Sequence, residues 1–401
     1  MRRAMVLLLA LVVLSVPASA VLLPCDADSD GHLTDEELSQ AILGYLTGSG
    51  YLQQDLRDAA FVHACWDGQP LTFTDSSGKE HTLYRPLRRI AVLNSETVET
   101  LRTLQVGPEA VVGIDTYTRD KPGFFAEYTS TPVIGSVFSP DYEKIVSLRP
   151  DAVFLYATVM KASGDEIAQR LSASMPETAV IRLDCYLPDT YPGEIEILGR
   201  ITGKNDEAER FIDFYSSQLK TVATRVNAIP EDERVKVYFE TWNDYKTAAE
   251  GSGYHDKIVA AGGTNIFGSE SASYPQVDPE AVIFRNPDIV IKLIGGGSLK
   301  FGGYIDTDRS KASGVHVALL TRPGWNAIPA VRNDRVYLIH SDIVGGPQQF
   351  IGITYLARWF YPDRFADIDP DDMHHRYLTE FQHRDGNLSG SGTFSYPSIA
   401  G

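Results

Sequence analysis

A short acidic segment near the N-terminus has the composition and spacing of a calcium-binding loop. Three aspartates alternate with other residues, and a glycine follows the third of them directly. Calcium takes about six to eight hard oxygen ligands, and a loop with acidic residues at alternate positions before a glycine can wrap around one ion. The segment therefore predicts bound Ca2+. The expected ligands are Asp26, Asp28, Asp30, His32 through its carbonyl oxygen, Thr34 and Glu37.

A second pattern occurs twice along the chain. Each copy has a glutamate, a Pro-Asp pair that begins seven residues later, and then a short apolar run. The glutamate suits the first turn of a helix, because the helix dipole favours an acid there, and the proline ends that helix. The apolar run is typical of a buried parallel strand, so the repeat predicts two similar lobes. The copies are Glu143, Pro150 and Asp151 before residues 152–156, and Glu280, Pro287 and Asp288 before residues 289–293.

The first 20 residues have the composition of a cleaved signal peptide. Arg2 and Arg3 precede an apolar run that ends at Ala18-Ser19-Ala20, a small-residue cleavage site. We therefore expect an exported, extracytoplasmic protein, periplasmic or at the cell surface. Loss of the two arginines changes the formal charge from −17 to −19. So acidic a chain argues against nucleic acid and anionic membrane surfaces as partners.

The calcium loop opens a small helical module. Apolar residues recur at helical spacing over residues 38–46 and 52–64. Too few residues would precede the loop after cleavage to form the incoming helix of a paired EF-hand, so the loop resembles the half-motif of a dockerin. We expect the ion to order this module, with protein docking as an alternative role. Cys25 and Cys65 could form a disulfide, or both could stay thiols, as could Cys185.

Beyond residue 66 the pattern is that of an α/β protein. A hairpin is expected over residues 71–84, and short apolar strands then alternate with amphipathic helices, an order that gives parallel sheets covered by helices. One helix, over residues 205–227, keeps its apolar spacing for about six turns. The expected parts are a signal peptide 1–20, a helical module 21–66, an N-terminal lobe 67–204, an inter-lobe helix 205–229, a C-terminal lobe 230–385 and a flexible tail 386–401 rich in Gly and Ser.

Over roughly residues 85–366 these features together resemble the iron-siderophore and cobalamin type of periplasmic solute-binding protein. The resemblance rests on R-P-L-R-R-I-A-V-L-N at 85–94, both Pro-Asp copies, the long helix and A-A-G-G-T-N-I-F at 260–267. It implies two Rossmann-like lobes with parallel sheets, bridged by one long α-helix. It also implies a monomeric receptor that carries a metal chelate, an iron(III)-siderophore or a corrinoid, to an ABC permease and its ATPase. In that family, glutamates placed like Glu143 and Glu280 dock onto permease arginines.

Ligand contacts are expected from the loops at the carboxyl ends of the strands, where open α/β sheets bind ligands. The loops that follow the predicted strands are rich in aromatic residues and hold a few cations. Flat rings suit a macrocycle or an aryl chelate, and a guanidinium or ammonium group can meet its anionic oxygens. The expected ligand-binding residues are Tyr117, Arg119, Phe138, Tyr156, Tyr186, Trp242, Tyr254, Tyr274 and Lys292.

Two other kinds of function stay open at the level of sequence. His255, His316 and His340 could converge and bind a metal ion directly, since imidazole suits zinc or iron, and haem is a further candidate solute. A secreted hydrolase is the other alternative, although the chain has no G-x-S-x-G, H-E-x-x-H or G-x-x-x-x-G-K-[ST] motif. We therefore expect a binding protein, not an enzyme, with no catalytic cofactor.

Overall fold

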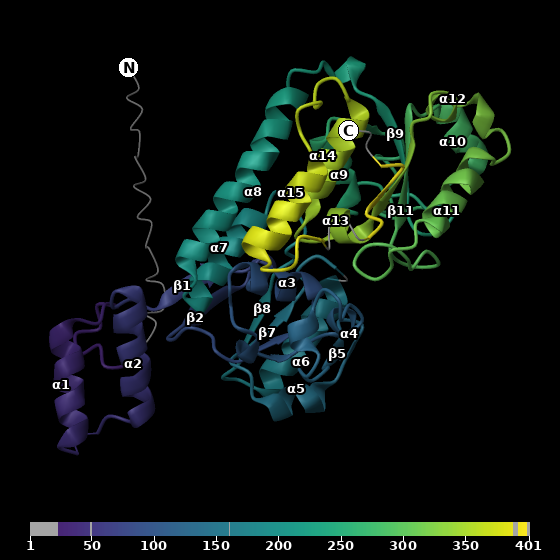
Figure 1. The fold of residues 1–401 in the computed structure, drawn as a ribbon. Helices are drawn as coiled ribbons and strands as arrows, with labels where there is room; N and C mark the ends of the chain where they lie inside the picture. Colours follow the sequence, from purple (N-terminus) through teal and green to yellow (C-terminus); the bar gives the residue numbers. More distant parts are fainter. Residues whose placement is uncertain (1–22, 49, 160, 388–391, 399–401) are drawn as a thin grey trace, which may run out of the picture. The chain divides into compact units, whose positions relative to one another are not determined.

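The computed structural model describes residues 23–48, 50–159, 161–387 and 392–398 (Figure 1). The expected signal peptide lies outside these residues. Contacts divide the chain into two compact units, one made of Met1–Thr72 with Thr82–Pro86 and the other of Phe73–His81 with Leu87–Gly401. The first unit holds the helical module, and the second holds both lobes.

The helical module contains the acidic loop and the two predicted helices, α1 (Asp35–Leu46) and α2 (Gln53–Trp66). α1 begins with a complete capping box, in which the Thr34 hydroxyl accepts from the Glu37 N–H and the Glu37 carboxylate accepts from the Thr34 N–H. Two backbone donors are thereby satisfied at the helix start. The small buried core of the module consists of Leu23, Leu33, Ala59 and Val62.

The three cysteines are unbonded. Cys25 is half-buried, Cys65 is exposed and Cys185 is buried. Of the two arrangements that the sequence allowed, free thiols are the one found. Burial raises the pKa of the Cys185 thiol well above its ordinary value, so this thiol stays protonated and unreactive.

The N-terminal lobe is built on a parallel four-stranded sheet in the order β4-β3-β7-β8. The central strands β3 and β7 are buried along their whole length, as expected of a sheet with both faces covered. Beyond β4 the chain adds one parallel bridge, between Ile114 and Val133. The elements are β1 (Leu71–Thr74), β2 (Glu80–Leu83), β3 (Ile90–Val92), α3 (Ser95–Thr103), β4 (Val111–Gly113), α4 (Thr116–Arg119), β5 (Gly135–Ser136), β6 (Ser139–Pro140), α5 (Tyr142–Leu148), β7 (Ala152–Leu155), α6 (Lys161–Ser174), β8 (Ala179–Arg182) and α7 (Tyr191–Thr202).

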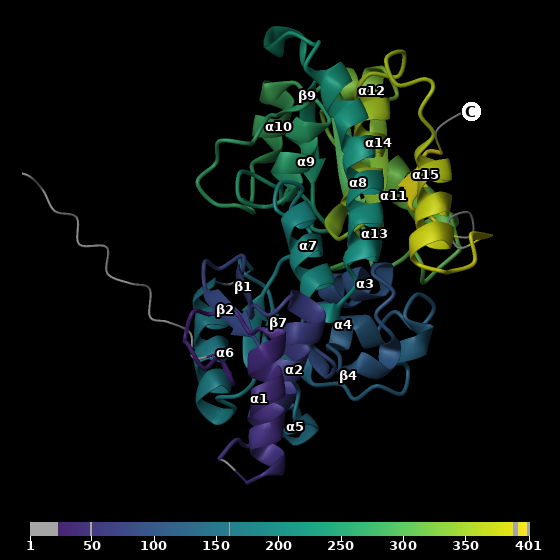
Figure 2. The ribbon, with the colours of Figure 1, turned by 90° about the vertical axis from the view of Figure 1, so that its left-hand side faces the viewer.

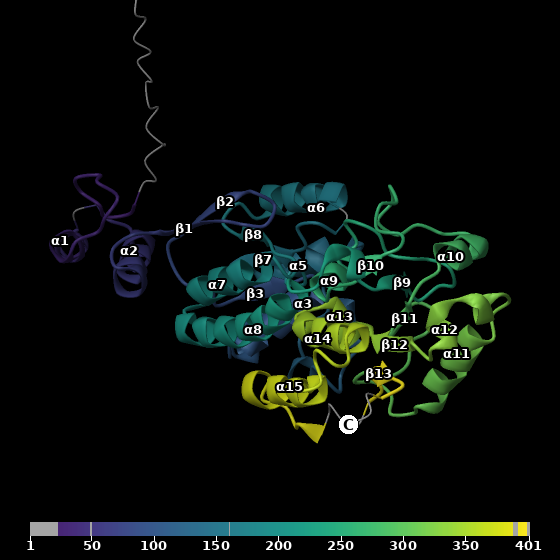
Figure 3. The same cartoon turned by 90° about the horizontal axis from the view of Figure 1, so that it is seen from above.

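The C-terminal lobe has a five-stranded sheet in the order β10-β9-β11-β12-β13, in which only β13 is antiparallel. Figure 3 shows α9, α13 and α14 on one side of this sheet and α10, α11 and α12 on the other. The elements are β9 (Lys236–Glu240), α9 (Tyr254–Ala260), β10 (Thr264–Asn265), α10 (Pro279–Arg285), β11 (Ile289–Ile294), α11 (Ser310–Leu320), α12 (Pro329–Arg332), β12 (Val336–His340), α13 (Ser341–Gly345), α14 (Gln349–Phe360), α15 (Pro370–Arg376) and β13 (Ser395–Tyr396).

The end of the chain differs from the prediction. A flexible tail was expected over 386–401, but Ser395 and Tyr396 pair with β12 as strand β13. Phe394 is buried, and its carbonyl oxygen accepts a hydrogen bond from the His340 N–H. These apolar and backbone contacts fix residues 393–396 to the sheet edge, although the Gly and Ser content before them is typical of a linker.

The long helix α8 (Asn205–Val226) joins the lobes, as predicted. It packs against α7 and α14, and Figure 2 shows it beside α14 along the C-terminal lobe. Phe211, Tyr215 and Val222 lie on its buried face. None of the described helices is both long enough and apolar enough to cross a membrane.

The helices α5 and α10 of the two Pro-Asp copies match closely. Both are seven residues long, and in both an aspartate caps the first turn: Asp141 accepts from the Lys144 N–H and Asp278 from the Glu280 N–H. Both helices end in a left-handed residue, Arg149 in one and Asn286 in the other, and the proline of the Pro-Asp pair follows. The two copies therefore share the same helix length, the same type of N-cap and the same left-handed end.

The aspartate of each Pro-Asp pair holds the start of the neighbouring central strand. Asp151 Oδ2 accepts from the backbone N–H groups of Arg88 and Arg89 at 2.9 Å, just before β3. Asp288 Oδ2 accepts from the N–H of Lys236 at 2.9 Å, where β9 begins. Charged acceptors make such bonds stronger than neutral ones, so the same device fixes strand position in both lobes.

Candidate functional site

The two lobes face each other where the carboxyl ends of their strands meet, and buried polar pairs join them. Lys121 Nζ of the N-terminal lobe lies 2.6 Å from Asp342 Oδ1 in α13. The Gln348 amide donates to Glu99 Oε1 of α3 at 2.8 Å. Burial raises the pKa of Glu99 to about 7. Burial alone would also raise the pKa of Asp342, but the Lys121 ammonium holds it well below its usual range.

Four of the predicted tyrosines gather where the two lobes meet, at the inter-lobe interface that is called the cleft below. Tyr156 and Tyr186 follow β7 and β8, and their rings meet edge to face with 6.2 Å between centroids. Tyr254 and Tyr274 of the other lobe form a similar pair at 6.5 Å. A Cβ atom at Gly253 would lie 3.1 Å from the Tyr186 ring, so the two pairs approach each other from opposite lobes.

Two carboxylates lie on the N-terminal side of the cleft. Glu96, in the first turn of α3, accepts a hydrogen bond from the Tyr156 hydroxyl. A Cβ atom at Gly346 would lie 3.5 Å from Glu96 Cγ, so the C-terminal lobe covers this carboxylate. Asp115 caps α4 by accepting from the Thr118 N–H at 2.6 Å, and burial raises its pKa to about 7.

Lys257 is the residue of this cleft that the sequence analysis missed. It lies in α9, three residues after Tyr254 and so on the same helix face, and it is 1% exposed. Its Nζ is 5.3 Å from the Tyr254 ring centroid and 5.6 Å from that of Tyr186. No hydrogen bond or ion pair joins this Nζ to any residue that the structure describes. Burial lowers the pKa of Lys257 from 10.5 to about 7.

A signal for this lysine is present in the sequence. Tyr254, Lys257, Ile258 and Ala261 follow the three-and-four spacing of one helix face. A cation on an otherwise apolar face is a buried charge that requires an explanation. Inspection of the loops alone could not detect it.

The prediction for Lys292 is wrong. This residue lies within β11 and is 1% exposed, and its Nζ is 2.6 Å from Glu240 Oε1. The guanidinium of Arg322 binds the same carboxylate at 2.7 and 2.9 Å. Lys292 belongs to a buried ion network within the C-terminal lobe and presents no free donor to a solute.

The other predicted ligand residues lie apart from the tyrosine cluster. The Arg119 guanidinium donates to the carbonyl oxygens of Tyr128 and Thr131, which braces a loop of the N-terminal lobe. Trp242 packs against Gly296, after the end of β9. Tyr117 and Phe138 are largely exposed. None of these four side chains bonds a tyrosine of the cluster among the described residues, so their ligand role stays a prediction.

The three histidines do not converge. The His340 ring accepts from the Asp342 N–H, His316 Nε2 bonds the Val336 carbonyl oxygen at 2.9 Å, and His255 lies beside Asn265. Among the residues described, the one His, Cys, Asp or Glu group with the spacing of metal ligands is that of Asp26, Asp28 and Asp30. The described residues therefore give no support to the alternative of a three-histidine metal site.

The acidic loop has part of the expected ligand geometry. One oxygen from each of Asp26, Asp28 and Asp30 lies within 4.8 Å of the others, and Gly31 has the left-handed φ of 85° that the turn requires. Glu37 bonds to backbone instead, since its carboxylate accepts from the N–H groups of Thr34 and Ala27. These bonds, the Thr34 ones foremost, lower the pKa of Glu37 to about 2.

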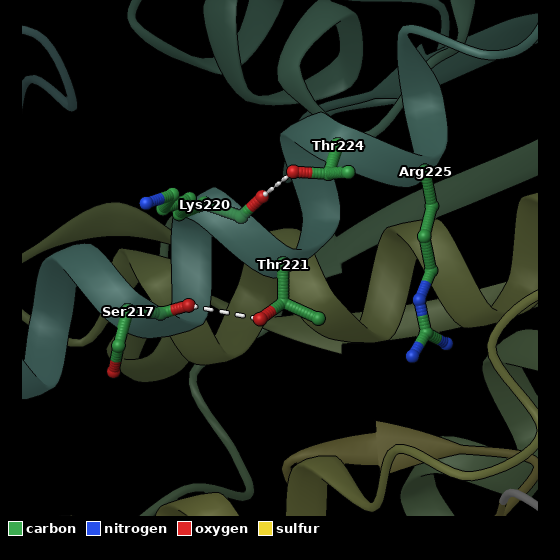
Figure 4. Close-up of a pocket in the computed structure, with 5 residues that line it drawn as sticks. All are labelled: Ser217, Lys220, Thr221, Thr224 and Arg225. Atoms are coloured by element: carbon green, nitrogen blue, oxygen red, sulfur yellow. Dashed lines mark hydrogen bonds between the residues drawn. The ribbon is translucent and has the colours of Figure 1, made fainter.

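A shallow hollow on α8 is not a comparable site. It is lined by Ser217, Lys220, Thr221, Thr224 and Arg225 (Figure 4). The hydroxyls of Thr221 and Thr224 already bond carbonyl oxygens of their own helix, and Arg225 is paired with Asp367. The hollow lies on the polar face of one helix, and its other cation, Lys220, is an exposed side chain.

Comparison with known proteins decides the family. The family model described as "Periplasmic binding protein" matches residues 90–343. The chain belongs to this family. It is a solute-binding protein of the ABC transporter type, and the two-lobe α/β fold predicted from sequence is confirmed.

Relatives within the family differ in their named solutes. An uncharacterized ABC transporter substrate-binding lipoprotein of Bacillus subtilis, YvrC, is 26% identical over 74% of this chain and 88% of its own length. A cobalamin-binding protein of Halobacterium salinarum is 26% identical over 57% of this chain and 60% of its own. The molybdate periplasmic binding protein MolA of Haemophilus influenzae, solved with molybdate, has a TM-score of 0.62 at 20% identity, over 79% of this chain and 98% of its own. The last likeness shows the fold alone.

Proposed function

We propose that this protein captures a metal chelate between its lobes and delivers it to the permease and ATPase of an ABC importer. The observation that supports this is the cluster of four tyrosines, contributed by both lobes at the carboxyl ends of their strands. Aromatic walls with a few convergent polar groups are typical of small-molecule sites. An iron(III)-siderophore and a corrinoid are the candidate solutes, and the cobalamin name of one relative agrees with the second.

Protein purified from its own cells provides the test. Native mass spectrometry together with visible absorbance should detect a coloured chelate. Tyr186→Leu should weaken its binding by roughly three- to tenfold, the usual contribution of one aromatic contact, whereas Tyr45→Leu, an exposed tyrosine of the helical module, should leave it unchanged. A colourless protein that binds no iron complex, corrinoid or metal oxyanion in calorimetry would contradict the proposal.

We further propose that Glu143 and Glu280 contact the permease. Both are exposed, and both occupy the second position of matched seven-residue helices. Each has an exposed apolar neighbour on its helix, Val146 at 39% and Phe284 at 89%. An identical placement in both lobes suits a partner with two similar halves.

Charge reversal tests the contact. The double variant Glu143→Arg with Glu280→Arg should abolish solute uptake by cells and leave solute affinity in calorimetry unchanged. The matched control reverses two other exposed glutamates, Glu177 and Glu231, and should transport normally. Normal solute uptake by the first variant would contradict the proposal that Glu143 and Glu280 contact the permease.

We also propose that the acidic loop binds one structural Ca2+ through Asp26, Asp28 and Asp30. Their clustered oxygens support this, and so does the position of the exposed Asp28 beside the Asp30 and Glu37 carboxylates. A hydrogen bond from the Asp30 N–H lowers the pKa of Asp28, but the remaining effects, these two carboxylates among them, raise it more. Calcium should add mass in native spectrometry and protect residues 23–66 from proteolysis. Asp28→Asn should remove both effects and Asp35→Asn neither; equal proteolysis with calcium and with chelator would contradict the site.

A further inference from the structure

The interface between the lobes contains a buried cation, Lys257, that the protein itself does not pair. Lys121 and Lys292 also contribute ammonium groups near the carboxyl ends of the strands, and each has a carboxylate oxygen at 2.6 Å. Lys257 is as buried as Lys292, yet no carboxylate or carbonyl oxygen of the described residues bonds its Nζ. Burial of a charge without a partner is strongly unfavourable, so this position requires a reason.

The surroundings of Lys257 supply only weak compensation. The Tyr254 and Tyr186 rings lie at 5.3 and 5.6 Å, near the outer limit of about 6 Å for a cation–π contact. The carboxylates of Asp256, on the same helix, and of Glu96 act on Lys257 through space without bonding it, and that of Glu96 already accepts from the Tyr156 hydroxyl. The ammonium therefore keeps unused donors between two tyrosines that belong to different lobes.

We propose that the Lys257 amino group receives an anionic oxygen of the solute, so that the cleft selects anionic metal–oxygen species over cationic chelates. This inference rests on the proposed function and narrows its solute class. The negative oxygen could belong to a carboxylate or catecholate chelator or to a metal oxyanion, because all three present the same charge to the ammonium. Tyr186 and Tyr254 then flank the bound group from the two lobes.

The choice of an anion follows from what each kind of solute does to Lys257. A negative oxygen gives the buried ammonium the partner that it lacks, and this gain is absent in the empty protein. A cationic solute would place a second positive charge beside it in a site closed to water, where like charges repel strongly. Lys257 is thus a specificity-determining residue whose burial is offset only in the loaded receptor.

Calorimetry with a panel of probes tests this inference. The probes are ferric citrate, an iron(III) tris-catecholate, molybdate, the cationic hydroxamate complex ferrioxamine B, and cyanocobalamin. Each is titrated into wild type, Lys257→Met, Lys257→Arg and Lys236→Met. Lys236 is an exposed lysine at the opposite end of β9 and serves as the matched control. Circular dichroism verifies that every variant is folded.

The expected result is that one of the three anionic probes binds, and that Lys257→Met loses on the order of ten- to a hundredfold in affinity, the usual effect of one charged hydrogen bond. Lys257→Arg should recover most of it, and Lys236→Met should equal wild type. The probe that binds identifies the source of the anionic oxygen. A probe that binds wild type and Lys257→Met equally overturns the inference and leaves the receptor function standing. If no probe binds, the proposed function itself is contradicted, and the inference falls with it.

Discussion

Lys257 and Lys292 are two lysines of the C-terminal lobe that are buried to the same degree. They differ in the groups that surround their ammonium groups. Both are 1% exposed. Lys292 lies inside a strand against Glu240, which also binds Arg322. Lys257 lies on a helix face at the cleft with two tyrosine rings and no bonded carboxylate. Burial alone therefore does not separate a structural cation from a binding cation; the presence of a partner within the protein does.

The physical reason is where the partner charge comes from. A buried ion pair approximately balances its own desolvation, but removal of one member leaves an isolated charge. Lys292 is satisfied before any solute arrives. Lys257 gains a charged partner only from a bound solute. Such destabilised positions are common at functional sites. Three measurements test this difference between the two lysines.

The largest effect is expected at Glu240. Glu240→Gln removes the carboxylate that Lys292 and Arg322 share, and leaves Lys292 only the more distant Asp244 Oδ1 at 3.4 Å. The free energy of unfolding should fall by about 3 to 5 kcal/mol, the usual cost of breaking a buried pair. Denaturant unfolding measures it, with the exposed Glu250→Gln as the control. A loss of unfolding free energy below about 1 kcal/mol is typical of surface pairs. Such a result would show that Lys292 needs no internal partner and does not differ from Lys257 in this respect.

A smaller effect of opposite sign is expected at Lys257. Lys257→Met replaces an unpaired buried ammonium with an apolar chain of similar length, so the solute-free protein should gain about 1 to 4 kcal/mol in unfolding free energy. Thermal unfolding without solute measures this gain. A destabilised variant would mean that the two tyrosine rings satisfy the ammonium, and Lys257 would then be structural.

The third and smallest expected effect is the change in the free energy of unfolding per pH unit. The groups that face Lys257 are Glu96 on α3, Asp256 and Tyr254 on its own helix, and Tyr186 after β8. Burial sets its pKa to about 7, below the ordinary 10.5. Between these values the unfolded chain binds more protons than the folded one, so stability should rise with pH.

The slope should be at most about 1.4 kcal/mol per pH unit, measured as the difference between wild type and Lys257→Met. Affinity for an anionic solute should change the other way and weaken as pH rises above 7, because the neutral amine offers no charge. Parallel pH profiles in both proteins would assign any slope to other groups.

Much of the fold was accessible from sequence because local signals and tertiary structure agree. The buried strands β7 and β11, the helix α8 and both α5 and α10 fall where apolar runs, prolines and acidic first turns placed them. The short edge strands β10 and β13 were missed. Each has two residues, and pairing with a neighbour, not its own composition, defines it.

The site was harder to predict than the fold. Four of the tyrosines in the predicted loops do gather, because carboxyl ends of parallel strands meet at one edge. The ligand role predicted for Lys292 was wrong because its partner Glu240 is 52 residues away and no local pattern links them. Lys257 was not predicted because it lies on a helix face, whereas ligand residues were expected in the loops that follow the strands. Pairing of charges over long sequence distances decides both cases.

The last strand has a consequence for how the protein is made. β13 closes the edge of the C-terminal sheet with residues 395 and 396, and Phe394 fills a pocket beside His340, His374 and Tyr304. The sheet of the N-terminal lobe needs nothing beyond β8. During synthesis the N-terminal lobe can thus assemble early, whereas the C-terminal lobe keeps an open strand edge until residues 394–396 have emerged.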